Sequence, residues 1–440
     1  MKKITNKGIT LVALVVTIIV LMILSSISIG AILSEKGIIQ QAKDSKKQHE
    51  DAVRKEEENL NELLGEYKNS MNGEGFGNGT VGGETTTPAT TPTPSVPKGP
   101  NGNQLVTSIT EKEHGTIEAE DIKGNKVVVP GGFKMAEDSG STVEEGIVVE
   151  DDIGNQFVWI PVSNINHDGS NKIKKNDGTE VEITLGRYSY NSSTGALAGS
   201  QYAINYENPT KYGNSKELII SRISSSSSEN TTAKDLAGFI NSVRVNNGFL
   251  FGRYEASYRS GKKVGVGTNE EYYKPASIKS RAYNETSMSY VEGTLWNWIT
   301  QSDAALVSRQ MYNGNDYVES DLVNSYMWDT AAVYIRSMGY TNYVIQGKYS
   351  STLNNTGLTV DQKCHIYDMA GNNQEWTTEY SSWSNSLGVY PCTLRGGCYW
   401  NSGGTYYVIG RDENKTTDNT GQISTGKTYS YGFRVGAWIK

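Results

Sequence analysis

The chain has 440 residues, of which 36% are hydrophobic and 20% charged, and its formal net charge is −7. Because this balance is acidic and no lysine or arginine cluster interrupts it, we expect no nucleic-acid partner. The three cysteines, Cys364, Cys392 and Cys398, are too few for a disulfide framework, and no C-x-x-C pair is present to form a zinc ribbon or a thioredoxin-type site.

The first element in chain order is an apolar segment, residues 9–34, that contains no charged side chain. As a helix of 26 residues it would extend roughly 39 Å, enough to cross a hydrocarbon core of ~30 Å. Lysines precede it and Glu35 follows it, so the positive-inside rule places the N-terminus in the cytoplasm. We therefore predict a transmembrane helix at 9–34 and an extracellular location, at the cell surface, for the rest.

The residues around this segment resemble the leader of type IV prepilins. A short basic leader, residues 1–8, ends in Gly8 and is followed by Ile9-Thr10-Leu11-Val12-Ala13-Leu14. The resemblance implies cleavage between Gly8 and Ile9 by a prepilin peptidase. Members of that family usually carry glutamate at the fifth mature position, where this chain has Ala13, and that glutamate is tied to assembly and N-methylation. Incorporation into a filament, as a minor pilin or pseudopilin, is therefore kept as an alternative.

Two segments separate this helix from the rest of the chain. Residues 35–70 carry charges of alternating sign with a thin apolar stripe, which is typical of a solvated helical stalk. Residues 71–104 are dominated by Gly, Thr and Pro, which predicts a disordered linker, flexible in its Gly part and extended in its Thr-Pro part.

From residue 105 to 440, short runs of Val, Ile, Phe and Tyr alternate with Gly, Asn and Asp, a pattern that indicates strands and hairpins. Apolar residues at helical spacing predict helices at 231–246 and 319–339, the second ending at a glycine. Strands, two helices and long loops together predict an α+β domain over residues 105–440.

Several segments of this domain are similar, in this order, to the formylglycine-generating enzyme family. They are FVWIPV (157–162), LFGRYEAS (250–257), LVNSYMWDTA (322–331), DMAGNNQEW (368–376), and RGG (395–397) with GFR (432–434). The resemblance implies the C-type-lectin-like fold that this family uses. The expected fold class is thus α+β, with a long N-terminal membrane-spanning helix, a disordered linker and a C-type-lectin-like domain.

The turn in DMAGNNQEW has two interpretations. Gly371 and Asn372 favour a tight turn after Asp368, and Glu375 or Asp368 is a candidate partner for the arginines of RGG and GFR. Family members often hold Ca²⁺ at this turn, so the resemblance also implies Asn372 and Glu375 as calcium ligands, through oxygen atoms that suit a hard cation. No other cofactor is expected.

The resemblance does not extend to the catalytic groups of the family. Its copper-dependent members use two cysteines after the RGG turn, at places that fall here near Asn401 and Tyr406, and its iron-dependent members use a histidine triad. We therefore expect no enzyme activity, with an oxidoreductase of altered site as the alternative. Cys392 and Cys398 are six residues apart, which leaves both a disulfide and two buried free thiols open.

The stretch after RGG is rich in Tyr, Trp, Asn, Ser and Gly, which are typical of recognition surfaces. It lies where lectin-like proteins diversified by retroelements carry their variable residues. We therefore predict an adhesin-like protein that binds an extracellular protein or glycan through Tyr399, Trp400, Asn401, Ser402, Thr405, Tyr406, Tyr407, Arg411, Asp412 and Asn414.

Overall fold

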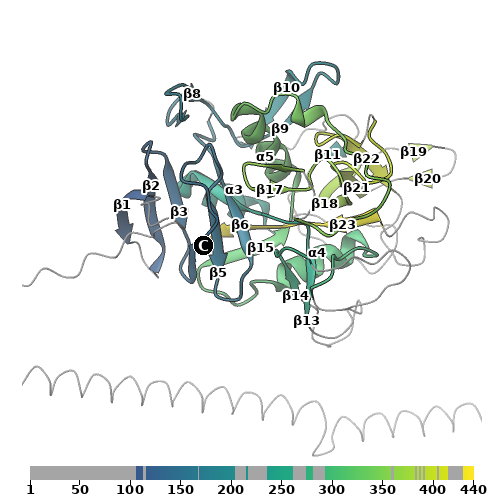
Figure 1. Cartoon of the computed structure of the whole chain (residues 1–440), viewed down its shortest axis with the longest axis horizontal. Helices are drawn as coiled ribbons and strands as arrows, with labels where there is room; N and C mark the ends of the chain where they lie inside the picture. Colours follow the sequence, from purple (N-terminus) through teal and green to yellow (C-terminus); the bar gives the residue numbers. More distant parts are fainter. Residues whose placement is uncertain are drawn as a thin grey trace, which may run out of the picture. The chain divides into compact units, whose positions relative to one another are not determined.

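Strands form most of the regular structure in the described part of the chain (Figure 1). The computed structural model describes residues 106–111, 115–166, 168–203, 215–216, 235–260, 274–280, 293–357, 361–381, 384–385, 388–389, 392–403, 406–414 and 430–440. The predicted leader (1–8), membrane helix (9–34), stalk (35–70) and linker (71–104) lie outside these residues.

A six-stranded antiparallel sheet has the order β15-β24-β12-β6-β5-β4. Its strands are β15 (Val318–Leu322), β24 (Val435–Ile439), β12 (Gly248–Gly252), β6 (Gln156–Pro161), β5 (Val148–Asp151) and β4 (Phe133–Met135). Five consecutive residues of β6 are buried, as expected for a strand that is covered on both faces.

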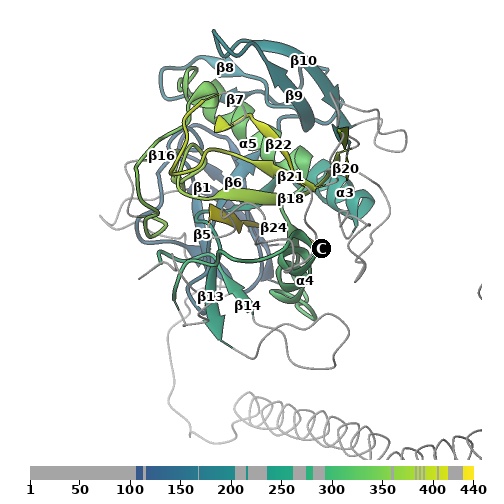
Figure 2. The same ribbon diagram turned by 90° about the vertical axis from the view of Figure 1, so that its right-hand side faces the viewer.

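A second sheet has the order β11-β18-β21-β22, and β23 pairs with β18 in parallel. Its strands are β11 (Ser215–Lys216), β18 (Gln374–Ser381), β21 (Cys392–Arg395), β22 (Arg411–Asn414) and β23 (Tyr431–Phe433). Figure 2 shows β18, β21 and β22 side by side. Because β24 begins at Val435, the chain crosses from this sheet to the six-stranded sheet at Arg434.

Smaller sheets complete the described strands. The three-stranded one is β1 (Val106–Glu111), β2 (Ile117–Asp121) and β3 (Lys126–Val129). The two-stranded ones are β7 (Ile173–Lys174) with β8 (Glu180–Val181), β9 (Gly186–Tyr190) with β10 (Leu197–Tyr202), β13 (Ser257–Ser260) with β14 (Lys274–Ala276), β16 (Gln362–Lys363) with β17 (Ile366–Tyr367), and β19 (Ser384–Asn385) with β20 (Gly388–Val389).

The described α-helices are α3 (Leu236–Asn246), α4 (Gln301–Gln310) and α5 (Ser325–Ser337), and a 3₁₀ turn, η3, covers Tyr343–Ile345. The helix predicted at 231–246 is observed from Leu236, after the N-cap Asp235. The helix predicted at 319–339 is half wrong, because its first residues form β15 and α5 begins only after the N-cap Asn324. Helix α4 was not predicted, although Thr300 caps it by accepting from the amide of Asp303.

The predicted fold class is wrong. The described residues are mostly β-sheet with few helices, and the three α-helices contain 11, 10 and 13 residues. Within the described ranges, no helix is long and apolar enough to cross a membrane. The prediction placed the start of the second helix too early because apolar residues such as Leu322 and Val323 match a helical spacing, while their burial comes from a strand and its following turn.

Candidate binding surface

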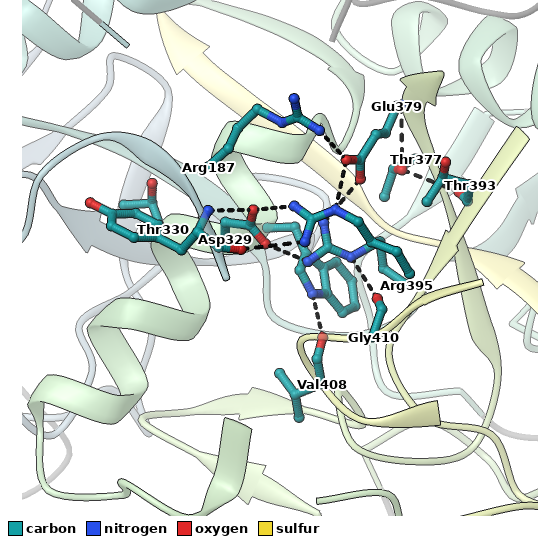
Figure 3. A network of polar contacts seen from close by, with 12 residues as sticks. Arg187, Asp329, Thr330, Thr377, Glu379, Thr393, Arg395, Val408 and Gly410 are labelled. Carbon is teal, nitrogen blue, oxygen red and sulfur yellow. Dashed lines mark hydrogen bonds and ion pairs between the residues drawn. The ribbon is translucent and has the colours of Figure 1, made fainter. Parts of the chain in front are cut away.

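Buried ion pairs hold together the elements that carry the predicted surface. Asp329 of α5 pairs with Arg395 of β21 and with Arg411 of β22. Glu379 of β18 accepts from Arg395 at 3.1 Å, from Arg411 at 2.8 Å and from Arg187 of β9. Figure 3 shows Arg187 and Arg395 pointing toward the carboxylate of Glu379. We name these five residues the arginine–carboxylate cluster.

The cluster contains three guanidinium groups and two carboxylates, so it carries one surplus positive charge. Backbone carbonyls accept some of the remaining donors, as Gly410 O does from Arg395 Nε at 2.8 Å. Burial and the neighbouring charge of Arg411 lower the pKa of Arg395, while Asp329 and Glu379 act in the opposite direction. The cluster thus fixes β21 and β22 against α5 through groups that are costly to separate.

The turn after β21 needs its two glycines. Gly396 has φ +79°, and a Cβ atom on Gly397 would lie 1.8 Å from the carbonyl oxygen of Ala370. The amide of Gly397 donates to Met369 O at 3.1 Å. The turn is therefore seated directly on the backbone of residues 369–371, where no side chain fits.

Beyond this turn, residues 398–403 and 406–409 lie beside residues 344–350. The amide of Ser350 donates to Tyr399 O at 2.9 Å, and that of Val408 donates to Gln346 O at 3.1 Å. The rings of Trp400 and Tyr406 lie edge to face, with their centroids 4.9 Å apart. Tyr349 is 62% exposed. We name the surface that these two segments form the aromatic face; it consists of Tyr349, Ser350, Trp400, Asn401, Ser402 and Tyr406.

The residues predicted to bind a ligand divide between this face and the interior. Trp400, Asn401, Tyr406, Tyr407 and Asp412 are half-buried, and Ser402 is exposed. Thr405 lies outside the described residues, and of Asn414 only the backbone, in β22, is described.

Two of the predicted ligand-binding residues are corrected. Tyr399 is buried against Leu295 and Leu353, and the side chain of Arg411 is only 15% exposed because Asp329 and Glu379 hold it. Neither side chain is exposed enough to contribute to a recognition surface. Asp412 accepts from Gln374 Nε2 at 3.2 Å, at the edge of the same region.

The prediction missed the second segment of the aromatic face. Tyr349 and Ser350 belong to KYSSTLNN (348–355), which has the same Tyr, Ser, Thr and Asn composition as the stretch after RGG. Composition could have identified this segment as a second candidate. Its position beside residues 398–403 and 406–409 comes from long-range backbone hydrogen bonds that the sequence does not reveal.

The predicted calcium ligands have other partners. Both carboxylate oxygens of Glu375 accept from Arg434, at 2.6 and 3.0 Å, and Asn372 Nδ2 donates to Glu255 at 2.5 Å. A cation at Glu375 would face the charge of Arg434, which corrects the prediction for this residue. Among the described residues, no group of three or more His, Cys, Asp or Glu side chains could hold a metal ion.

The three cysteines are free and buried, so the disulfide between Cys392 and Cys398 is not formed in this structure. Burial raises the pKa of Cys364 to about 12 and raises that of Cys392 well above its usual value. Because the thiolate is the reactive form, these thiols are poorly placed for redox or metal chemistry at neutral pH.

Comparison with known proteins gives no further assignment. No family model matches the chain, and neither the curated proteins nor the solved structures gave a match. The resemblances of residues 1–14 and 157–434 described above stay predictions.

Proposed function

We propose that this chain is a non-catalytic, surface-displayed binding protein that attaches to an extracellular protein or glycan through the aromatic face. The observation that carries the proposal is the exposure of Tyr349 in a segment that is hydrogen-bonded to the segment of the half-buried pair Trp400 and Tyr406. Large aromatic groups held in place, with small polar neighbours such as Ser350 and Ser402, suit recognition because few rotamers are lost on binding.

The support beneath this face favours binding by a surface that is already in its bound shape. The Gly397 turn rests on backbone, and the arginine–carboxylate cluster fixes the strand that precedes the turn and the one that follows the face. A surface that is ordered before binding loses less entropy when it meets its ligand.

In the proposed arrangement, the apolar segment 9–34 anchors the protein, residues 35–104 act as stalk and spacer, and the described part is outside the cell. Cleavage after Gly8 by a prepilin peptidase belongs to the same proposal. Diversification of the residues in the aromatic face joins the proposal where a reverse transcriptase gene and a near-copy of the C-terminal codons lie beside the gene for this protein.

Binding is tested with the full-length chain displayed on bacterial cells, measured as retention on arrays of immobilised extracellular proteins and glycans. We expect retention on at least one class of spot, and a strong loss of it in the double variant Tyr349→Ala, Ser402→Arg. The matched control is Tyr340→Ala, which removes another exposed tyrosine, 43% exposed, outside the face. Retention that all variants share would contradict a role for the aromatic face.

The same preparation tests the non-catalytic part of the proposal. Titration with Cu(I) and a cysteine-containing peptide measures metal uptake and thiol oxidation together. We expect neither, because Cys364, Cys392 and Cys398 are buried. Stoichiometric copper binding with oxidation of the peptide would support the oxidoreductase alternative instead.

A further inference from the structure

Two hairpins of the structure have the same loop, thirty residues apart in the chain. The loop between β2 and β3 is Asp121-Ile122-Lys123-Gly124-Asn125, and the loop between β5 and β6 is Asp151-Asp152-Ile153-Gly154-Asn155. Both have the pattern D-x-x-G-N after a glutamate, Glu120 or Glu150. We name them loop 1 and loop 2.

The hydrogen bonds of the two loops correspond one to one. Asp121 Oδ1 accepts from the amides of Lys123 and Asn125 at 2.8 and 2.9 Å, and Asp121 Oδ2 accepts from Asn125 Nδ2 at 2.9 Å. In loop 2, Asp151 makes the same contacts with Ile153 and Asn155, at 3.1, 2.7 and 2.7 Å. The two glycines also agree, with φ +80° and +84°.

Each loop also holds a segment from elsewhere in the chain. Asn125 Oδ1 accepts from the amide of Lys174 at 2.8 Å, and Asn155 Oδ1 accepts from the amide of Ser277 at 3.2 Å. Each asparagine side chain therefore both closes its own loop and fixes a crossing segment. The repeat is thus one of tertiary arrangement as well as of sequence.

A cavity lies beside each loop. The one at loop 1 has a volume of about 310 Å³ and is lined by Glu120, Gly124, Lys126 and the crossing residues 171–174. The one at loop 2 has a volume of about 500 Å³ and is lined by Glu150, Gly154, Gln156 and the crossing residues 278–279, with Lys134, Glu137, Asp138 and Tyr254. Both volumes are in the range of small-ligand sites.

Four of the nine charged side chains that line the cavities are paired. Lys126 pairs with Glu118 at 2.5 Å, Lys134 with Glu150 at 3.7 Å, and Arg253 holds Asp138 at 2.7 Å. The side chains in these pairs have little net charge left to offer a ligand.

Each cavity also offers one carboxylate and at least one ammonium group that no described residue pairs with. At loop 1 these are Glu120 with Lys172 and Lys174, and at loop 2 they are Glu137 with Lys279. Opposite charges on one lining fit a ligand that carries both charges itself. A lining that offered only an ammonium group would select an anion, and one that offered only a carboxylate would select a cation.

We propose that each of the two cavities is a site for a small zwitterion, a ligand with an ammonium and a carboxylate group such as an amino acid or a short peptide. In each site the glutamate binds the ammonium of the ligand and the lysine of the crossing segment binds its carboxylate. These sites are separate from the aromatic face, so the proposal does not depend on the proposed function. Two sites on one chain also give a polymer with zwitterionic units a bivalent attachment.

The test is saturation-transfer NMR on the full-length chain with glycylglycine as the probe, because the method detects weak binding. N-acetylglycylglycine lacks the ammonium, glycylglycinamide lacks the carboxylate, and glucose lacks both. We expect signal from glycylglycine, about fivefold less from each blocked analogue, as loss of one exposed ion pair would give, and none from glucose. Equal signals from glycylglycine and a blocked analogue, or a signal from glucose alone, would overturn the proposal.

Variants assign the signal to the two sites. Glu137→Gln with Lys279→Met removes the unpaired charges at loop 2, and Glu120→Gln with Lys172→Met and Lys174→Met removes those at loop 1. We expect each set to lower the glycylglycine signal and the combined variant to abolish it. All the substituted side chains are exposed, so the folded state is retained, which the unchanged thermal midpoint verifies. A combined variant that keeps the full signal would overturn the assignment.

Discussion

Asp329 of α5 and Arg395 of β21 form an ion pair in which neither side chain has any exposure to solvent. The two residues are 66 positions apart, and the pair joins a helix to the strand that leads into the RGG turn. Glu379, which is also fully buried, and Arg411, which is 15% exposed, complete the ion pairs beneath the aromatic face.

The surplus positive charge of the arginine–carboxylate cluster predicts an order of stability. Asp329→Asn leaves three arginines with one carboxylate, so we expect a loss of ~3–5 kcal/mol in the free energy of unfolding. Arg395→Met leaves two of each and should cost less. Urea denaturation followed by tryptophan fluorescence measures both. Arg244→Met, at an exposed position of α3, is the control and should change stability by less than about 0.5 kcal/mol. A larger loss for Arg395→Met than for Asp329→Asn would contradict the charge argument.

The seating of the RGG turn predicts that Gly397 tolerates no side chain. We expect Gly397→Ala to lose about 3 kcal/mol or more, because its Cβ atom would lie 1.8 Å from Ala370 O. Gly403→Ala is the matched control, since its nearest neighbour, Asn401 Oδ1, is 3.8 Å away. Thermal unfolding of the two variants compares them directly. Similar midpoints would show that the turn can move.

His365 predicts a loss of stability in mildly acidic solution. Burial and the nearby charge of Arg253, whose Nη2 lies 3.1 Å from Nδ1, hold the pKa of His365 below its ordinary value of 6.5. The unfolded chain therefore takes up a proton first as the pH falls, and the folded state loses stability from about pH 6.5 down through the folded-state pKa.

The measurement is the free energy of unfolding at several pH values between 5 and 8, for the wild type and for His365→Gln. We expect the wild type to lose more stability than the variant between pH 7 and pH 5, by about 1 kcal/mol for each unit of pKa depression. Identical pH profiles would show that His365 titrates as it does in the unfolded chain.

The cysteines predict slow chemical modification. Because Cys364, Cys392 and Cys398 are buried, we expect iodoacetamide to label none of them in the folded protein and all three after denaturation. Intact mass under non-reducing conditions should show three thiols. Rapid labelling of one cysteine in the native state, or a mass lower by two hydrogen atoms, would contradict the structure here.

Strands and helices were predictable from the sequence where their burial follows the spacing of apolar residues along the chain. Strand-forming runs such as FVWIPV became β6, and the helical spacing at 236–246 became α3, because burial there follows the periodicity of the residues. The capped start of α4 at Thr300 could also have been recognised. The boundary between β15 and α5 could not, because an apolar stretch that begins in a strand and ends in a helix fits a helical period over its whole length.

The prediction of site residues was less successful for a physical reason. Arg411 and Trp400 stand in the same polar, aromatic stretch, yet one is held by Asp329 and Glu379 and the other contributes to the aromatic face. The partners of Arg411 come from α5 and β18. Composition identifies the kind of residue that can bind a ligand, but it does not say which of these residues have partners in the interior.

The pattern D-x-x-G-N shows the division between sequence and tertiary structure. It occurs at 121–125, 151–155 and 368–372, and in each case its letters alone determined a turn, since Gly and Asn favour the conformations that turns need. In the first two copies the aspartate closes its own loop. In the third, Asp368 has φ +65° and its carboxylate instead accepts from Thr356 Oγ1 at 2.8 Å and from the amide of Gly357 at 2.9 Å. Only the tertiary structure decided this difference, because the donors that reach a carboxylate are set by which distant segments the fold brings next to it.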